Sequence, residues 1–478
     1  MINKYIKYKK KYLNLKNKLK GGGEKRKRDF DIDNNRYVKY YIQSEIMYNT
    51  NKILFDSRIQ NFINSNDFLL NLFNRLNISY KINNSSFSKY LQDPIIVFKQ
   101  IRGNQYAYIK VAECSYDYIN FLHNDLEITD NNVNIQLNGN GNDYGGNFIS
   151  SPPINNTNGY VFYFAGISEL LKEKLAETLA QELVELNCSF KCDNERHIDE
   201  AMTFMPYGIN KFKIWFYQPN KIIFNQTLID ILYNEHRSLN YINNLNEERY
   251  NEILDDEIID LKDIHDFAKN KIEARNKLIK DLKNKKFPSI TMKYINKFNF
   301  KTKELFSKIK YIYNDLIIQK LISNEQLLAI DPNITQDQFI NRLQQICLEK
   351  LQNECLQNLN IISNKLFNNL YHNVSNNFVL FPIDLGVDLN SEENLNFIYS
   401  KPPVFNRLWI ETQEECFFIR SNSEGNEETD QIVNNELPNI KSYLYELKPI
   451  HYLNVNTIEY HTDGNCGGNL HCLIKQIL

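Results

Sequence analysis

Short apolar runs alternate with helical segments between about residues 37 and 225, and this alternation constrains the fold more than any other feature of the sequence. Residues 95–98 and 160–164 are apolar runs of the length expected for buried strands. Ser168 is a suitable N-cap for a helix that follows the second run. The apolar stripe of that helix is expected to comprise Leu171, Leu175, Leu179 and Leu183. Alternating strands and helices predict an α/β architecture.

The pattern becomes helical between residues 226 and 355, where apolar residues recur every three or four positions. Pro288 ends the first stripe, and the last one begins at Thr335, with Gln338 placed for a capping box. Because each stripe buries one face, this block is expected to be a large helical insertion that packs upon itself. It would shield a site or dock a partner. The predicted division of the chain is a basic leader (1–36), the first part of an α/β body (37–225), the helical insertion (226–355) and the rest of the body (356–478).

The leader begins with a basic amphipathic segment, which a glycine run and the basic residues 25–28 follow. Its apolar stripe comprises Tyr5, Tyr8, Tyr12, Leu15 and Leu19. This opening resembles a leader found on many proteins of giant cytoplasmic DNA viruses. An address tag, a nuclear signal, a helix that docks a partner and a solvated basic tail are the alternatives.

Charge and cysteine usage limit the partners and the compartment. The 56 basic and 58 acidic residues give a net charge of −2, which predicts no global attraction to nucleic acid or to an anionic membrane. No apolar run approaches the ~20 residues of a membrane-spanning helix, and the N-terminus lacks the apolar core of a secretory signal. The 8 cysteines are expected to be free thiols in a reducing compartment, either the cytoplasm of a host or the interior of a virion.

Four local patterns contain the residues that carry chemistry: Tyr-Leu-Gln-Asp at 90–93, Gly-Asn-Phe-Ile-Ser-Ser-Pro-Pro at 146–153, His-Ile-Asp-Glu at 197–200 and Gly-Gly-Asn-Leu-His-Cys at 467–472. Each has an ordinary structural explanation when taken alone. A lone cysteine is usually a small buried hydrophobe, and Gly-Gly-Asn is usually a turn. Their combination is more informative, because a thiol, an imidazole and two carboxylates make a nucleophilic site.

The chemistry that fits these groups is attack on a guanidinium. In a strand, His197 and Asp199 would point to the same face. Asp93 and Asp199 would hold the nitrogens of the cation, since carboxylate oxygens match paired N–H donors. The Cys472 thiolate would attack the guanidinium carbon, and His197 would transfer protons. A neighbouring imidazolium and a bound cation both favour the thiolate form of the cysteine.

In this order the four patterns resemble those of the protein-arginine deiminases. Residues 197–200 are similar to the family's His-Val-Asp-Glu, and Phe204 and Pro206 match its continuation. Residues 90–93 resemble its Trp-Met-Gln-Asp, and residues 146–153 its Gly-Asn-Leu-Glu-Val-Ser-Pro-Pro. The C-terminal pattern is similar to that of bacterial agmatine deiminases, a sister family. The resemblance covers about residues 37–225 and 356–478.

The resemblance implies a five-bladed propeller of ββαβ modules, the pentein fold, with the reaction centre on its axis. Asp93, His197, Asp199 and Cys472 would be catalytic, and Asn147 would join Asp93 and Asp199 in binding the substrate. No cofactor is implied. The substrate would be an arginine-containing protein or a small guanidine, and a partner could dock on the helical insertion or on the basic N-terminus.

Some residues depart from the family pattern. Pro94, Ile96 and Ile149 stand where the animal enzymes have acidic calcium ligands, and none of the three offers a side-chain oxygen, so no metal is expected at these places. Arg102 is poorly placed to grip a peptide backbone, and Arg196 stands where the family has glycine. By overall resemblance, the leading hypothesis is a hydrolase that converts peptidyl-arginine to peptidyl-citrulline. The alternatives are an agmatine deiminase-like enzyme, an amidino transferase, and a catalytically silent structural or virion protein that retains the fold.

Overall fold

The computed structural model describes the following residues: 39–46, 50–57, 67–83, 91, 93–111, 116–128, 135–136, 143–154, 156–188, 197–208, 211–226, 229, 233, 236, 326, 329–331, 333–389, 395–399, 407–411, 416–421, 427–444, 450–455 and 474–477. The chain divides into two compact units, residues 1–38 and residues 39–478. All described residues belong to the second unit.

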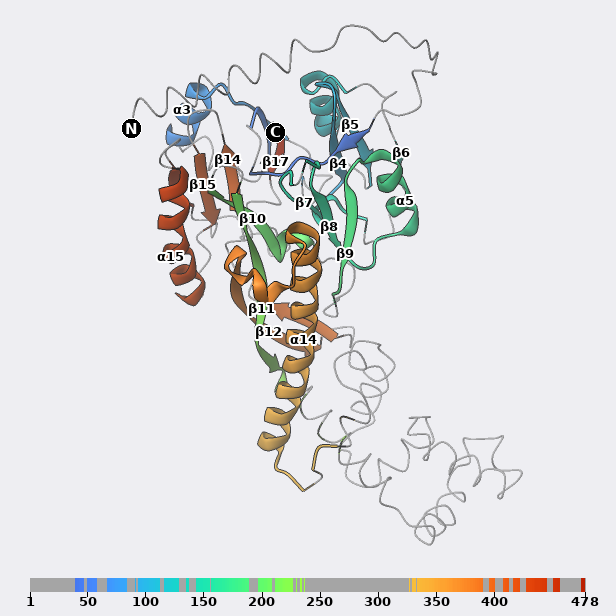
Figure 1. Ribbon diagram of the computed structural model, residues 1–478, viewed down its shortest axis with the longest axis vertical. Helices are drawn as coiled ribbons and strands as arrows, with labels where there is room; N and C mark the ends of the chain where they lie inside the picture. Colours follow the sequence, from blue (N-terminus) through green and yellow to red (C-terminus); the bar gives the residue numbers. More distant parts are fainter. Residues whose placement is uncertain are drawn as a thin grey trace, which may run out of the picture. The chain divides into compact units, whose positions relative to one another are not determined.

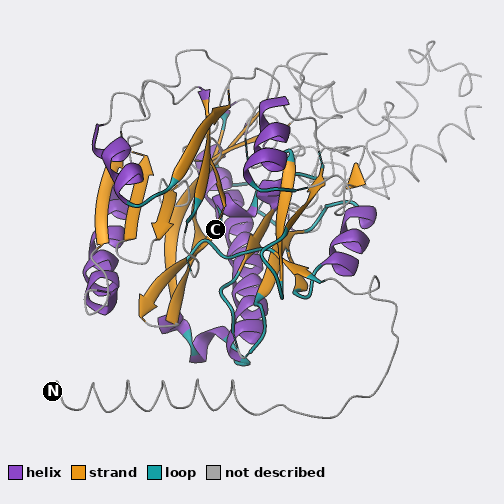
Figure 2. Ribbon diagram, turned by 90° about the horizontal axis from the view of Figure 1, so that it is seen from above, coloured by secondary structure: helices purple, strands orange, loops and turns teal. Residues whose placement is uncertain are grey.

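The described strands form five small sheets, each built on the same ββαβ module (Figure 1). Two strands pair in antiparallel fashion, a helix follows the second strand, and a third strand then pairs in parallel with the second. Figure 2 shows the helices and strands of these modules by colour. The predicted α/β class is confirmed, as a mixed α/β structure of several small sheets.

The modules follow one another along the chain. The first comprises β4 (Ile95–Gln100), β5 (Tyr106–Lys110), α4 (Tyr116–Asn120) with a π-helical turn (Phe121–Asp125), and β6 (Ile135–Gln136), and β1 (Tyr40–Tyr41) pairs with the outer side of β4. The second comprises β7 (Phe148–Ser150), β8 (Tyr160–Phe164), α5 (Glu169–Thr178) and β9 (Glu182–Leu186). The third comprises β10 (Met202–Gly208), β11 (Lys211–Phe224), α14 (Gln336–Phe367) and β12 (Phe378–Leu389), which β13 (Leu395–Tyr399) extends. The fourth comprises β14 (Arg407–Glu411), β15 (Cys416–Ser421), α15 (Glu427–Leu444) and β16 (Ile450–Val455).

The fifth module joins segments from opposite ends of the sequence. Its first strand is β17 (Ile474–Ile477), which pairs antiparallel with β2 (Lys52–Asp56). After α3 (Asp67–Arg75), β3 (Ser79–Asn83) pairs in parallel with β2. Residues more than 400 positions apart, such as Phe55 and Ile474, are therefore neighbours in one ladder.

Helix α5 begins as predicted but ends early. Ser168 caps it, because its Oγ accepts a hydrogen bond from the Leu171 N–H at 3.2 Å. Leu179 has an extended backbone and bridges to Tyr40, and Leu183 lies in β9. The prediction that one helical stripe runs to Leu183 is therefore wrong. Residues four apart share a face in a strand as well as in a helix, so the spacing alone did not distinguish the two.

Helix α14 also begins as predicted, with the complete capping box at Thr335 and Gln338. It continues to Phe367, where Asn368 adopts the left-handed conformation that ends it. It lies along β11 (Figure 1). Its inward face is mainly apolar and includes Phe339, Leu343, Leu351, Leu359 and Ile362. The boundary predicted at residue 355 thus falls inside one helix that packs on the third sheet. Residues 237–325 of the predicted insertion, and the leader, lie outside the described residues.

The main core lies between α14 and the third sheet. Trp215 of β11 is fully buried and contacts Phe381 of β12, with ring centroids 5.1 Å apart. Phe339 of α14 belongs to the same cluster. In the described part of the chain no helix is both long enough and apolar enough to span a membrane.

Candidate functional site

The candidate site residues occupy equivalent places in the modular repeat. Asp93 precedes β4, Asn147 precedes β7, and Asp199 precedes β10, and each of these strands is the first of its module. In the sequence, Cys472 precedes β17 in the same way, although its own position lies outside the described residues. Four of the five modules therefore begin next to a residue of the predicted site.

The structure brings three of the predicted site residues together: Asp93, His197 and Asp199. His197 Nδ1 lies 3.4 Å from Asp93 Oδ1 and 4.0 Å from Asp199 Oδ1. All three residues are buried, with exposed fractions of 9% for Asp93, 7% for His197 and 6% for Asp199. The imidazole thus lies within reach of two carboxylates that come from different modules.

His197 and Asp199 are not part of a strand, so that expectation is wrong. His197 is the extended N-cap residue of a 3-10 helix, η4 (Ile198–Glu200), and Asp199 lies inside it. The Glu200 N–H donates to the His197 carbonyl at 3.2 Å, which closes the turn. Ile198 is fully buried in the main core. An extended residue followed by a tight turn around this anchor leaves the two polar side chains side by side, as a strand would.

Gly146 lies against both of these side chains. It belongs to the 3-10 helix η3 (Gly145–Asn147), which contacts η4. A Cβ atom on Gly146 would stand 2.6 Å from His197 Nδ1 and 3.3 Å from Asp199 Oδ2. A side chain at this position would therefore force either the turn or the imidazole to shift. The Gly145 N–H donates to the Asp93 carbonyl at 2.9 Å, so the same turn also contacts the third residue of the cluster.

Asn147 is buried at the end of this turn, and its N–H donates to the Tyr144 carbonyl at 3.0 Å. The Tyr144 ring lies beside the imidazole of His197, with centroids 5.8 Å apart. Sequence reasoning missed Tyr144 and the buried Asp143 before it. The signal that could have found them is the run Asp-Tyr-Gly-Gly-Asn, in which adjacent glycines indicate a close backbone approach.

Two described cysteines have a structural role in the core. Cys347 and Cys355 lie on the inward face of α14, and burial raises the pKa of each thiol to about 12. Cys355 Sγ donates to the Tyr217 carbonyl at 3.3 Å. Because the thiolate is the nucleophile, neither group is suited to attack at neutral pH.

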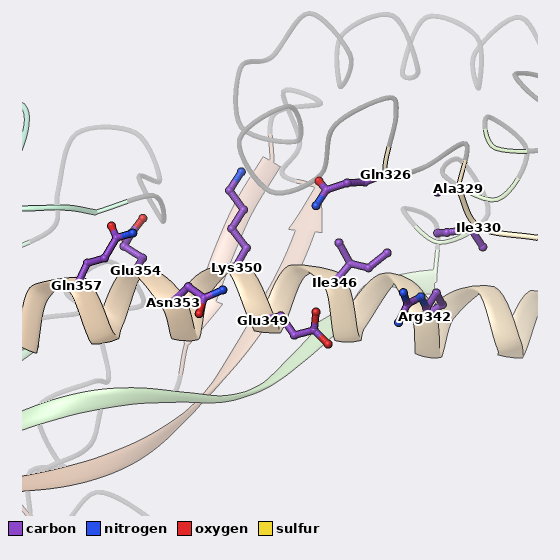
Figure 3. Close-up of a pocket in the computed structure, with 10 residues that line it drawn as sticks. All are labelled: Gln326, Ala329, Ile330, Arg342, Ile346, Glu349, Lys350, Asn353, Glu354 and Gln357. Carbon is purple, nitrogen blue, oxygen red and sulfur yellow. The ribbon is translucent and has the colours of Figure 1, made fainter. Parts of the chain in front are cut away.

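A cavity of about 590 Å³ runs beside α14 and shares no residue with the cluster (Figure 3). Side chains of both charges border it, among them Arg342, Glu349, Lys350 and Glu354.

Within the described ranges, no group of three or more His, Cys, Asp or Glu side chains has the arrangement of a metal site. Pro94 and Ile96, which follow Asp93 in the sequence, are both buried. The Pro94 carbonyl accepts a hydrogen bond from the Val111 N–H at 2.8 Å.

Chemically, the cluster joins a proton carrier to two negative groups in a site of low solvent exposure. Burying two carboxylates is costly unless positive charge accompanies them. His197 would supply one such charge when protonated, and a cationic ligand would supply another. Carboxylate oxygens also match the paired N–H donors of a planar cation such as a guanidinium.

No protein-family model and no curated protein sequence matches this chain. Among solved structures, it is similar to C. jejuni agmatine deiminase, with 10% sequence identity and a TM-score of 0.38. The alignment covers 93% of this chain and 98% of that chain. A likeness of this size leaves function to be argued from the site itself.

Proposed function

We propose that this chain is a hydrolase acting on a guanidino group, which converts peptidyl-arginine to peptidyl-citrulline and releases ammonia. The observation that supports it is the position of His197, with its Nδ1 3.4 Å from Asp93 and 4.0 Å from Asp199. A guanidinium offers paired N–H donors to such carboxylates. An imidazole beside them could give a proton to the amino group that leaves and take one from the attacking water.

Cys472 is the nucleophile in this proposal. Its thiolate forms a bond to the guanidinium carbon while Asp93 and Asp199 hold the nitrogens. His197, as the imidazolium, gives its proton to the amino group, which leaves as ammonia. The neutral imidazole then takes a proton from a water that attacks the S-linked carbon. Cleavage of the C–S bond releases the ureido product and the thiolate, and the surplus hydroxyl proton converts ammonia to ammonium.

The proposal includes the arrangement of the five modules as blades around a common axis. Two observations support it. The pairing of β17 with β2 completes a fifth module from both ends of the described chain. The candidate residues also precede the first strands of four modules, so blades around an axis would bring all of them to its centre.

The substrate can be distinguished by assay. The purified protein would be incubated with arginine peptides, free arginine and agmatine, and ammonia and ureido products would be measured. Turnover of peptides supports the leading proposal, and turnover of agmatine alone supports the small-guanidine alternative. Since Pro94, Ile96 and Ile149 offer no side-chain oxygen, we expect activity to survive EGTA.

The nucleophile has a matched control in the same segment. Cys472→Ser is expected to lower kcat at least ~10³-fold, because a hydroxyl is a far weaker nucleophile than a thiolate. Cys466→Ser should retain activity. Equal losses in the two variants would contradict the assignment, and no turnover of any guanidine by the unmodified protein would favour a structural role.

A further inference from the structure

The buried carboxylate of Asp143 ties the turn before β7 to the start of α5. Asp143 Oδ1 accepts from the Ser168 N–H at 2.8 Å, and Oδ2 accepts from the Ser168 hydroxyl at 2.5 Å. Ser168 Oγ also accepts from the Leu171 N–H, so the carboxylate stands at the positively polarised end of the helix. Two hydrogen bonds from Ser168 therefore hold Asp143 in place. Asp143 is the first residue of the segment 143–147, which we call the anchor loop.

The rest of the anchor loop touches every described member of the cluster. Gly145 holds the backbone of Asp93 through a 2.9 Å hydrogen bond. Gly146 abuts His197 and Asp199 so closely that a Cβ atom would stand within 3.3 Å of both side chains. Tyr144 packs its ring beside the imidazole. The loop is therefore a spacer between Asp93, which precedes β4, and the His197–Asp199 pair, which precedes β10.

We propose that Asp143 is a positioning residue, which acts through the anchor loop to set the spacing between the Asp93 carboxylate and the His197 imidazole. This inference rests on the proposed function, because it assigns a part in the reaction to a residue that need not touch the substrate. Displacements of about 1 Å in such geometry lower rates by about 10²-fold. The Asp143 carboxylate bonds Ser168, and the contacts with the imidazole are made by Tyr144 and Gly146, so the effect of Asp143 must be transmitted through the loop.

The kinetic test compares Asp143→Ala with Asp143→Asn and with Thr335→Ala. Asp143→Ala is expected to lower kcat/KM about 10- to 100-fold, since it releases the loop from α5. Asp143→Asn keeps an acceptor oxygen for Ser168 and should recover most of that loss. Thr335→Ala removes the N-cap of α14 and controls for an ordinary loss of helix stability. An equal loss of kcat/KM in Thr335→Ala would overturn the proposal.

A second readout does not depend on turnover. In protein labelled with ¹³C-histidine, the ring ¹Hε1–¹³Cε1 resonance of His197 is assigned by its disappearance in His197→Gln. It is expected to shift in Asp143→Ala and to stay in place in Thr335→Ala. If Asp143→Ala does not fold, Ser168→Ala, which removes the hydroxyl donor, is measured instead. An unchanged His197 resonance in the folded variant overturns the role of Asp143, whereas absence of turnover in the unmodified protein overturns only the proposed reaction.

Discussion

At the scale of single residues, the candidate site depends on the absence of a side chain at Gly146 as much as on the groups around this residue. The backbone there lies so near His197 that the space of one methyl group is already occupied. A substitution must move either the turn or the imidazole. The carboxylates that flank His197 are fixed by separate modules, so a displaced ring loses its alignment with both.

Gly146→Ala is accordingly expected to lower kcat/KM by about 10²-fold, with an unfolding free energy reduced by about 1–3 kcal/mol. Steady-state assays and urea unfolding measure the two effects. Gly103→Ala is the matched control, because its Cβ would meet only the side chain of Gln100 on an exposed turn. Full activity in Gly146→Ala would show that the His197 ring adapts and that its observed place is not required.

At the scale of elements, a side chain of α14 forms hydrogen bonds with the backbone of the second module. Asn358 is fully buried, and its amide both accepts from the Asn187 N–H and donates to the Asn187 carbonyl, at 2.8 Å each. Asn187 directly follows β9. The helix of the third module is thereby hydrogen-bonded to the end of the last strand of the second module.

Asn358→Leu is expected to lower the unfolding free energy by about 1–3 kcal/mol, because it leaves two backbone groups of Asn187 without these partners. Urea unfolding followed by circular dichroism measures the change. Asn341→Leu, the same substitution at an exposed position of α14, should change stability by less than about 0.5 kcal/mol. Equal effects at the two positions would show that the amide bonds contribute nothing.

The inward face of α14 also predicts a pH dependence. The pKa of both Cys347 and Cys355 is raised from 9.0 to about 12, so the folded state keeps two protons that the unfolded state loses above pH 9. The stabilisation is thus complete below pH 9 and is lost as pH rises towards 12. Each thiol should lower the unfolding free energy by roughly 1.4 kcal/mol per pH unit within that window.

The measurement is urea unfolding at pH 8 and pH 10 for the unmodified protein and for Cys347→Ala. The variant is less stable at pH 8, because it leaves a cavity, but it should lose less stability between the two pH values. Equal losses in both proteins would mean that Cys347 ionises without unfolding.

At the scale of the whole molecule, the long segment between β11 and α14 is joined to the third module at two nearby points. His236 Nε2 lies 2.9 Å from the Ile330 carbonyl, and the Tyr233 hydroxyl donates to the Ile334 carbonyl at 3.1 Å. Both rings also pack on Phe339, with centroid distances of 5.0 and 5.3 Å. Described residues on either side of 237–325, among them His236 and Ile330, are therefore neighbours.

Replacing residues 237–325 with a short Gly/Ser linker should leave the remaining chain folded, because insertions with adjacent ends are removed without stretching the body. Size-exclusion chromatography and thermal unfolding would test this. Replacing residues 226–355 is the informative contrast, since it removes the first half of α14 and should abolish folding. Aggregation of both deletion variants would show that residues 237–325 belong to the core.

Sequence reasoning worked where chemistry or a local rule was involved. The capping box at Thr335 predicts the start of α14. The side-chain types at Asp93, His197 and Asp199 predict that these residues lie near one another, and the distances of 3.4 and 4.0 Å between His197 and the two carboxylates agree with this prediction. It failed where packing decides. The end of α5 depends on where the next strand pairs, and the turn at Ile198 depends on a buried anchor. The pairing of Phe55 with Ile474 has no local signal at all.

That last pairing has a consequence for the order of events during synthesis. Strand β2 emerges from the ribosome early, but its antiparallel partner β17 is made after every other described strand. Until then one edge of β2 has no neighbour, and unpaired edges invite association with other chains. Translation must therefore proceed through β17 before this sheet closes, so a nascent chain stalled earlier would be a target for chaperones and would lack the segment that carries Cys472.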